Sequence, residues 1–143
     1  RYEFLDMDAV IEIEAGVSIP VIFETQGEAV FRSMEADLVR RLAGRTGCVV
    51  ATGGGTIANP DNLEILKSCG TVVCLTADPQ TILARVGSGE DRPMLDVEDK
   101  EKRITELMGK RAAAYAQADI TVDTSTRSID EVAHFIHESL QHD

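Results

Sequence analysis

Apolar positions along this chain follow two alternating spacings. Short runs of β-branched and small apolar residues, which are typical of strands, occur at 48–51, 71–75 and 120–122, and a shorter run at 4–5 leads into a predicted strand over 4–8. Between these runs, apolar residues recur every three or four positions, as on one face of a helix. Strands that alternate with helices predict an α/β fold with a parallel sheet.

The predicted helices have recognisable beginnings. Proline stands in the first turn at Ser18-Ile19-Pro20, Asn59-Pro60-Asp61 and Asp78-Pro79, and Ser128 with Glu131 forms a capping box. The longest amphipathic pattern covers 27–43, where the apolar face comprises Phe31, Met34, Leu38 and Leu42. Further helices are predicted over 10–14, 98–116 and from 128 onward.

Three consecutive glycines, Gly53, Gly54 and Gly55, begin one residue after the end of the predicted strand 48–51. Glycines there lose more backbone entropy than other residues and leave no side chain above the main chain. Such a site allows another group to approach the backbone closely, and the carboxyl end of a parallel strand is where α/β proteins bind ligands. A flexible loop is the alternative explanation.

The length of the chain predicts how many domains it forms, and its charge indicates which kinds of partner it can bind. With 143 residues the chain is expected to form one domain with its own core. The 25 acidic residues exceed the 14 Lys and Arg, which disfavours a nucleic-acid surface but allows a few converging arginines to bind a small anion. The sequence contains no apolar run long enough to span a bilayer.

Cysteine usage points to a reducing compartment. Cys48, Cys69 and Cys74 are odd in number and lie in or beside apolar runs, so we expect them to be small buried residues in a cytoplasmic protein.

Two carboxylates end the first predicted strand. Asp6 and Asp8 lie two residues apart, which suits a hydrated Mg²⁺, a proton acceptor, or one of each. The alternative is that Asp6 caps a helix beside a solvated Asp8.

Three arginines are candidates for binding an anion, each with an ordinary alternative. Arg32 lies four residues after Glu28 and could form a surface ion pair with it. Arg92 lies in the glycine-containing segment 87–97, which reads as a flap that closes over a phosphoryl group or as a plain surface loop. Arg111 could pack on Tyr115 one turn later.

In combination, these motifs closely resemble shikimate kinase, of the P-loop kinase superfamily. The match comprises Phe-Leu-Asp-Met-Asp at 4–8, Ile22-Phe23, Gly27-Glu28-Ala29-Val30-Phe31-Arg32, Gly53-Gly54-Gly55, Arg92-Pro93-Met94-Leu95, and Lys110-Arg111 with Tyr115. Each motif is weak alone, but their order and spacing extend over almost the whole chain. The resemblance implies a three-layer fold with a parallel sheet, of the nucleoside-monophosphate-kinase type.

The resemblance also implies a set of residues for binding shikimate. Arg32 and Arg111 would bind the carboxylate through charge-assisted hydrogen bonds. Asp8 would accept from ring hydroxyls near the one that attacks the γ-phosphate of ATP. The three glycines would let backbone N–H groups reach the substrate, and Phe23 and Phe31 would form walls of the pocket.

On the nucleotide side, the resemblance implies ATP and Mg²⁺. Asp6 would hold Mg²⁺ through water, and Arg92 would close onto the phosphates. Arg127 resembles an arginine beside the adenine ring, and Arg85 would flank the same ring.

One part of the family pattern is missing. The phosphate-binding loop Gly-x-x-x-x-Gly-Lys-Ser/Thr is expected about twenty residues before Asp6, and the sequence begins after that point. In the family topology, the strand before this loop is central, so its absence would leave a gap between the strands at 48–51 and 71–75. We therefore expect a longer natural protein and little activity from residues 1–143 alone.

Two other functions stay open at this stage. One is a kinase-like domain without catalysis that binds a partner or a hydroxy-acid ligand, and the other is a kinase for a different polyhydroxy acid such as gluconate. For the leading function, we expect a monomer that binds shikimate and ATP and has no nucleic-acid or membrane partner.

Overall fold

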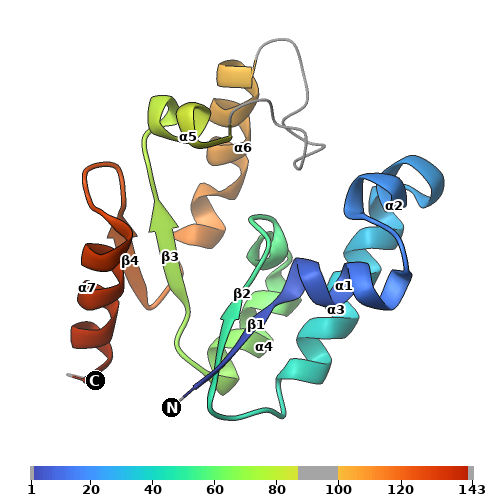
Figure 1. Cartoon of the computed structure of the whole chain (residues 1–143), viewed down its shortest axis with the longest axis horizontal. Helices are drawn as coiled ribbons and strands as arrows, with labels where there is room; N and C mark the ends of the chain where they lie inside the picture. The colour runs from blue at the N-terminus through green and yellow to red at the C-terminus, as the bar shows by residue number, and fades with distance from the viewer. Residues whose placement is uncertain (1, 87–99, 142–143) are drawn as a thin grey trace. The chain divides into compact units, whose positions relative to one another are not determined.

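The computed structural model describes residues 2–86 and 100–141, so the predicted flap at 87–97, with Arg92, lies outside the described residues. The described chain divides into two compact units, one ending at residue 70 and the other beginning at residue 71. Each unit combines one pair of parallel strands with helices (Figure 1). The predicted α/β class with parallel strands is therefore confirmed, while the assignment to one domain stays a prediction.

The first unit is built on strands β1 (Glu3–Asp6) and β2 (Cys48–Ala51). They pair in parallel with Phe4 opposite Val49. The helical elements of this unit are α1 (Met7–Ala15), α2 (Ile19–Gln26), α3 (Glu28–Leu42), the short 3₁₀ helix η1 (Thr56–Ala58) and α4 (Pro60–Cys69).

The core of the first unit lies between α1, α2 and α3. Its buried residues are Met7, Ile11, Ile22, Phe31, Leu38 and Val39. The predicted apolar face of α3 packs here as expected, with Met34 and Leu42 partly buried against the core. The same buried face of α3 also contains a carboxylate, Glu35.

The first helix begins earlier than its apolar pattern predicted. Strand β1 ends at Asp6, whose Oδ1 accepts the backbone N–H groups of Asp8 at 3.0 Å and Ala9 at 3.4 Å. A carboxylate at this position satisfies N–H groups that the helix leaves unpaired, so the helix forms from Met7. The predicted strand through Asp8 was wrong, and Asp8 lies in the first turn of α1.

The second unit is built on strands β3 (Val73–Thr76) and β4 (Ile120–Asp123), which pair in parallel. Its helices are α5 (Pro79–Val86), α6 (Lys100–Tyr115) and α7 (Ile129–Gln141). The buried strand predicted over 71–75 is only partly correct, because Leu75 is exposed and the strand begins two residues later.

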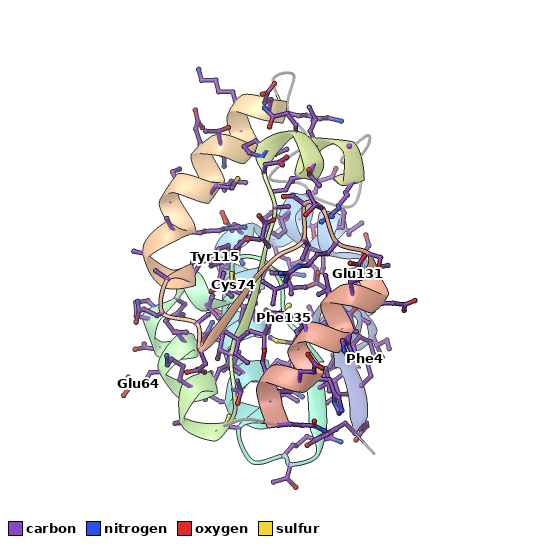
Figure 2. The ribbon with its side chains drawn as sticks, turned by 90° about the vertical axis from the view of Figure 1, so that its left-hand side faces the viewer. Phe4, Glu64, Cys74, Tyr115, Glu131 and Phe135 are labelled. Atoms are coloured by element: carbon purple, nitrogen blue, oxygen red, sulfur yellow. The ribbon has the colours of Figure 1, made fainter. Side chains whose placement is uncertain are left out.

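The capping box at the start of α7 is confirmed. The Glu131 N–H donates to Ser128 Oγ at 3.1 Å, and the Ser128 N–H donates to Glu131 Oε1 at 3.0 Å. Figure 2 shows Glu131 in the first turn of α7 and Phe135 one turn later. The predicted apolar face of this helix is incompletely covered, since Phe135 is exposed.

The cysteines fit the prediction in part. Cys74 is buried, which raises the pKa of its thiol, and Cys48 is half-buried. Cys69 is exposed at the end of α4, so its predicted burial was wrong. Within residues 2–86 and 100–141, no helix combines the length and apolar character needed to cross a bilayer.

Candidate functional site

The glycine loop, residues 53–55, lies between β2 and η1 and is separated from β2 by Thr52. Its backbone is held in a tight turn, because the Thr56 N–H donates to the Gly53 carbonyl and the Ala58 N–H donates to the Gly55 carbonyl, both at 3.2 Å. Helix η1 follows at once, so the loop has a defined course.

Protein side chains lie directly against two of these glycines. A methyl group on Gly55 would lie 2.7 Å from Arg32 Nη1 and 2.8 Å from Nη2. A methyl group on Gly53 would lie 3.2 Å from Glu35 Oε2 and 3.4 Å from Asp8 Oδ1. The loop is therefore without side chains where these three groups of the protein approach it.

Arg32 has two carboxylate partners on its own helix. Its Nη1 donates to Glu35 Oε1 at 3.0 Å, and its Nη2 lies 3.5 Å from Glu28 Oε1. The predicted pair with Glu28 exists, but the Glu28 side chain is 47% exposed whereas that of Glu35 is 2% exposed. The buried partner has the shorter contact and so determines where the guanidinium lies.

Glu35 is held in turn by the residue after the glycine loop. Thr56 is completely buried, and its Oγ1 donates to Glu35 Oε2 at 2.8 Å. The two oxygens of the Glu35 carboxylate therefore contact different partners, Thr56 and Arg32. A buried carboxylate needs such partners to offset its loss of hydration.

The ring of Phe31 lies beside Arg32, and the ring of Phe23 packs against that of Phe31. The Phe23 and Phe31 ring centroids are 5.2 Å apart at an interplanar angle of 44°, and Arg32 Cζ lies 5.2 Å from the Phe31 centroid. The first unit thus gathers most of the residues predicted to bind the acid: Asp8, Arg32, Gly53, Gly55, Phe23 and Phe31. Gly54 lies between the two glycines of the loop.

Of the other predicted arginines, Arg85, Arg111 and Arg127 belong to the second unit, and Arg92 lies outside the described residues. Arg111 lies on α6, four residues before Tyr115. Arg85 Nη1 donates to Thr124 Oγ1 at 2.8 Å, and its Nη2 donates to the Thr124 carbonyl at 2.7 Å. The Arg127 guanidinium lies over the ring of Phe135, 4.7 Å from its centroid.

Glu35 and Thr56 were missed by the sequence analysis. Glu35 lies four residues after Phe31 and three before Leu38, so it falls on the apolar face of α3. A carboxylate within an otherwise apolar helical face was the available signal, since such a residue is rarely buried without a partner. Thr56 gave no comparable signal, because its role depends on a contact 21 positions away.

The fit of a divalent cation can be judged at Asp6. Among the described residues, no group of three or more potential ligands comes together, whereas Asp6 supplies a carboxylate at the start of α1. Mg²⁺ keeps several waters and often takes one or two protein carboxylates together with substrate phosphates. Asp6 fits that manner of binding.

Comparisons with known proteins agree on one family. The family model for shikimate kinase matches residues 1–141. The shikimate kinase of Cupriavidus pinatubonensis is 42% identical over 142 residues, covering 99% of this chain and 74% of that protein. The shikimate kinase of Caldanaerobacter subterraneus is also 42% identical, over 133 residues that cover 93% of this chain and 78% of that protein.

Solved structures agree with these relatives. The shikimate kinase from Acinetobacter baumannii in complex with shikimate has a TM-score of 0.95 and 36% identity, and the match covers 99% of this chain and 79% of that one. The Aquifex aeolicus shikimate kinase has a TM-score of 0.85 and 34% identity, covering 98% and 82% of the two chains. Together with the predicted motifs, these matches show that the chain belongs to the shikimate kinase family.

Proposed function

We propose that Asp8, Arg32 and the glycine loop 53–55 bind shikimate for phosphorylation by ATP, which is the reaction of this family. The observation that supports this most strongly is the placement of Arg32. Its guanidinium lies against Gly55 and is paired with a buried carboxylate. Because Glu35 already holds the Arg32 side chain in one orientation, Arg32 loses little conformational entropy when it binds the carboxylate of the substrate.

In this proposal Arg32 binds the substrate carboxylate. A guanidinium presents its donors in a planar fork that matches a carboxylate, so it fixes both the position and the orientation of the acid. The family resemblance adds Arg111 as a second cation for the same group. Phe23 and Phe31 supply the apolar surface that a carbon ring needs.

Asp8 is proposed as the proton acceptor. Its Oδ1 lies at the glycine loop, close to the side chains that support Arg32. A carboxylate there accepts from the ring hydroxyls and takes the proton from the one that attacks the γ-phosphate of ATP. Phosphoryl transfer depends mainly on positioning and electrostatic stabilisation, so the same contacts that bind the acid also align its hydroxyl.

The nucleotide is proposed to contact the remaining arginines. Arg85 and Arg127 flank the adenine, and Arg92 contacts the phosphates. The hydrogen bonds from Arg85 to Thr124 and the stacking of Arg127 on Phe135 limit the freedom of both side chains, which favours binding of a flat ring. Asp6 is proposed to hold Mg²⁺ through water, and the cation would neutralise charge on the phosphates.

We also propose that the protein acts as a monomer in the cytoplasm. The three free thiols support a reducing compartment.

The direct test measures ADP release by the full natural protein with shikimate and, separately, with gluconate. We expect turnover with shikimate and little with gluconate, and we expect Asp8→Asn to lower kcat by about a hundredfold or more while thermal stability stays close to wild type. A preference for gluconate would favour the alternative substrate. Tight shikimate binding without turnover would favour a kinase-like binding protein.

A further inference from the structure

Thr56 occupies the junction of three parts of the first unit. Its N–H donates to the carbonyl of Gly53 at 3.2 Å, which closes the turn of the glycine loop. Its own carbonyl accepts from Asn62 Nδ2 of α4 at 3.0 Å, and Asn62 is itself buried. The backbone of Thr56 is therefore fixed from both sides, and its hydroxyl has a defined position.

That hydroxyl reaches the carboxylate that orients Arg32. Thr56 Oγ1 donates to Glu35 Oε2 at 2.8 Å, while Glu35 Oε1 accepts from Arg32 Nη1 at 3.0 Å. With one oxygen held by Thr56, the carboxylate cannot rotate without losing a hydrogen bond in a buried site. The orientation of Glu35, and hence that of Arg32, is thereby linked to the course of the glycine loop.

The glycine loop completes this arrangement by leaving room for the guanidinium. A methyl group on Gly55 would lie within 3.0 Å of three Arg32 atoms, Nη1, Nη2 and Cζ. Real Cβ atoms essentially never make contacts that short, so the position of the guanidinium requires a glycine here. Arg32 is thus confined between Glu35 and the loop.

We infer that Thr56 is a positioning residue for the substrate carboxylate, acting through Glu35 on Arg32. This inference rests on the proposed role of Arg32 in binding that carboxylate. Thr56 itself contacts no substrate. Its hydroxyl holds Glu35 so that the guanidinium presents its fork in one orientation.

Thr56→Val tests this inference, because valine has nearly the shape of threonine and lacks the donor. We expect KM for shikimate to rise about tenfold, which is the change in affinity that the loss of one charge-assisted hydrogen bond typically causes. KM for ATP stays at the wild-type value. Thr56→Ser, which restores the hydroxyl, returns KM for shikimate to within about threefold of wild type.

A neutral analogue separates positioning from a general loss of structure. Calorimetry with the full natural protein compares shikimate with its methyl ester, which has no charged carboxylate for Arg32. Thr56→Val is expected to weaken shikimate binding about tenfold and ester binding by no more than about twofold. Equal losses for both ligands, or an unchanged affinity for shikimate, would overturn the inference.

Two further variants make the result specific. If Thr56 acts through Glu35, the Thr56→Val, Glu35→Gln double variant loses no more shikimate affinity than Glu35→Gln alone. Fully additive losses would contradict that route.

The control is Thr105→Val, which removes an exposed hydroxyl bonded to the Glu101 carbonyl on α6. This variant should behave as wild type. Should Thr56→Val not fold, Thr56→Ala enters the same comparisons.

Arg32→Ala separates the proposed role of Arg32 from the inferred role of Thr56. If it leaves the preference for shikimate over the ester intact, the proposed role of Arg32 fails, and the inference about Thr56 fails with it. If Arg32→Ala abolishes the preference but Thr56→Val does not alter it, the proposed role of Arg32 stands and the role of Thr56 is wrong.

Discussion

At the scale of single residues, the glycine loop gives space to side chains of the protein itself. The sequence analysis assigned Gly53, Gly54 and Gly55 to the substrate, because glycine allows close approach to the backbone. In the structure, Arg32 lies over Gly55, and Glu35 and Asp8 lie beside Gly53. Two of the glycines therefore help place the charged groups proposed to bind the substrate.

Gly55→Ala follows from this arrangement. The added methyl group would occupy space within 2.8 Å of both terminal nitrogens of Arg32, so the guanidinium must move. We expect KM for shikimate to rise about tenfold or more, with a smaller change in kcat, since a displaced fork binds the carboxylate less well. Steady-state kinetics check this. Gly44→Ala, at a position where an added methyl group meets nothing within 4 Å, is the control. Wild-type KM in Gly55→Ala would show that Arg32 tolerates displacement.

Arg32→Lys tests the geometry of the cation while keeping its charge. A lysine cannot offer two parallel donors to a carboxylate, so we expect KM for shikimate to rise about tenfold while KM for ATP is unchanged. Kinetics with each substrate varied in turn measure both values. An unchanged KM for shikimate would mean that Arg32 does not bind the carboxylate.

At the scale of helices and strands, local signals predicted most elements well. The helix start at Ser18-Ile19-Pro20 and the capping box of α7 both lie where the sequence placed them. The clearest error concerned the start of α1. The apolar pattern there begins at Val10, but the cap at Asp6 adds a further turn. Polar caps extend helices beyond their apolar face, and the periodic pattern alone does not detect them.

Asp6 therefore has two roles that substitution can separate. Asp6→Asn keeps an oxygen that caps α1 and removes the charge proposed to attract Mg²⁺, so we expect near-wild-type stability and a higher Mg²⁺ requirement. Asp6→Ala also removes the cap and should lower the free energy of unfolding by about 1 kcal/mol. Thermal melts and Mg²⁺ titrations of activity check the two effects. An unchanged Mg²⁺ requirement in Asp6→Asn would leave Asp6 with the capping role alone.

At the scale of the whole molecule, several exposed carboxylates link stability to pH. Hydrogen bonds lower the pKa of four of them: Glu14 through Arg41, Asp78 through Thr81, Asp123 through the Ser125 N–H, and Glu131 through the Ser128 N–H. The folded pKa of each carboxyl lies below its unfolded pKa. Each carboxylate therefore stabilises the fold fully above about pH 5 and loses that contribution as the pH falls through the folded pKa.

Acid should therefore lower the melting temperature while the range between about pH 5 and 7 changes little. Glu14→Gln provides a specific check, because Glu14 accepts from Arg41 at 2.7 Å through both oxygens. It should lower the melting temperature at neutral pH and have a smaller effect near pH 3, because the contribution of the wild-type carboxylate declines as the pH falls below its unfolded pKa. An equal effect at both pH values would contradict this assignment.

The limits of prediction at this scale have a physical cause. Most helix starts and the parallel pairing of strands depend on local patterns and general topology and were predictable, whereas the start of α1 was not. The buried contact between Glu35 and Thr56 joins residues 21 positions apart, and no local pattern encodes it. The motifs identified the residues proposed to bind the substrate, but the structure was needed to find the residues that hold them.

The central claim is that Arg32, oriented by buried Glu35 against the glycine loop, binds the carboxylate of shikimate. A crystal structure of the full natural protein with shikimate and ADP tests it most directly. We expect a shikimate carboxylate oxygen at about 3 Å from the Arg32 guanidinium, with the Arg32–Glu35 and Glu35–Thr56 contacts retained. A carboxylate bound elsewhere, with Arg32 turned away from the ligand, would contradict the account.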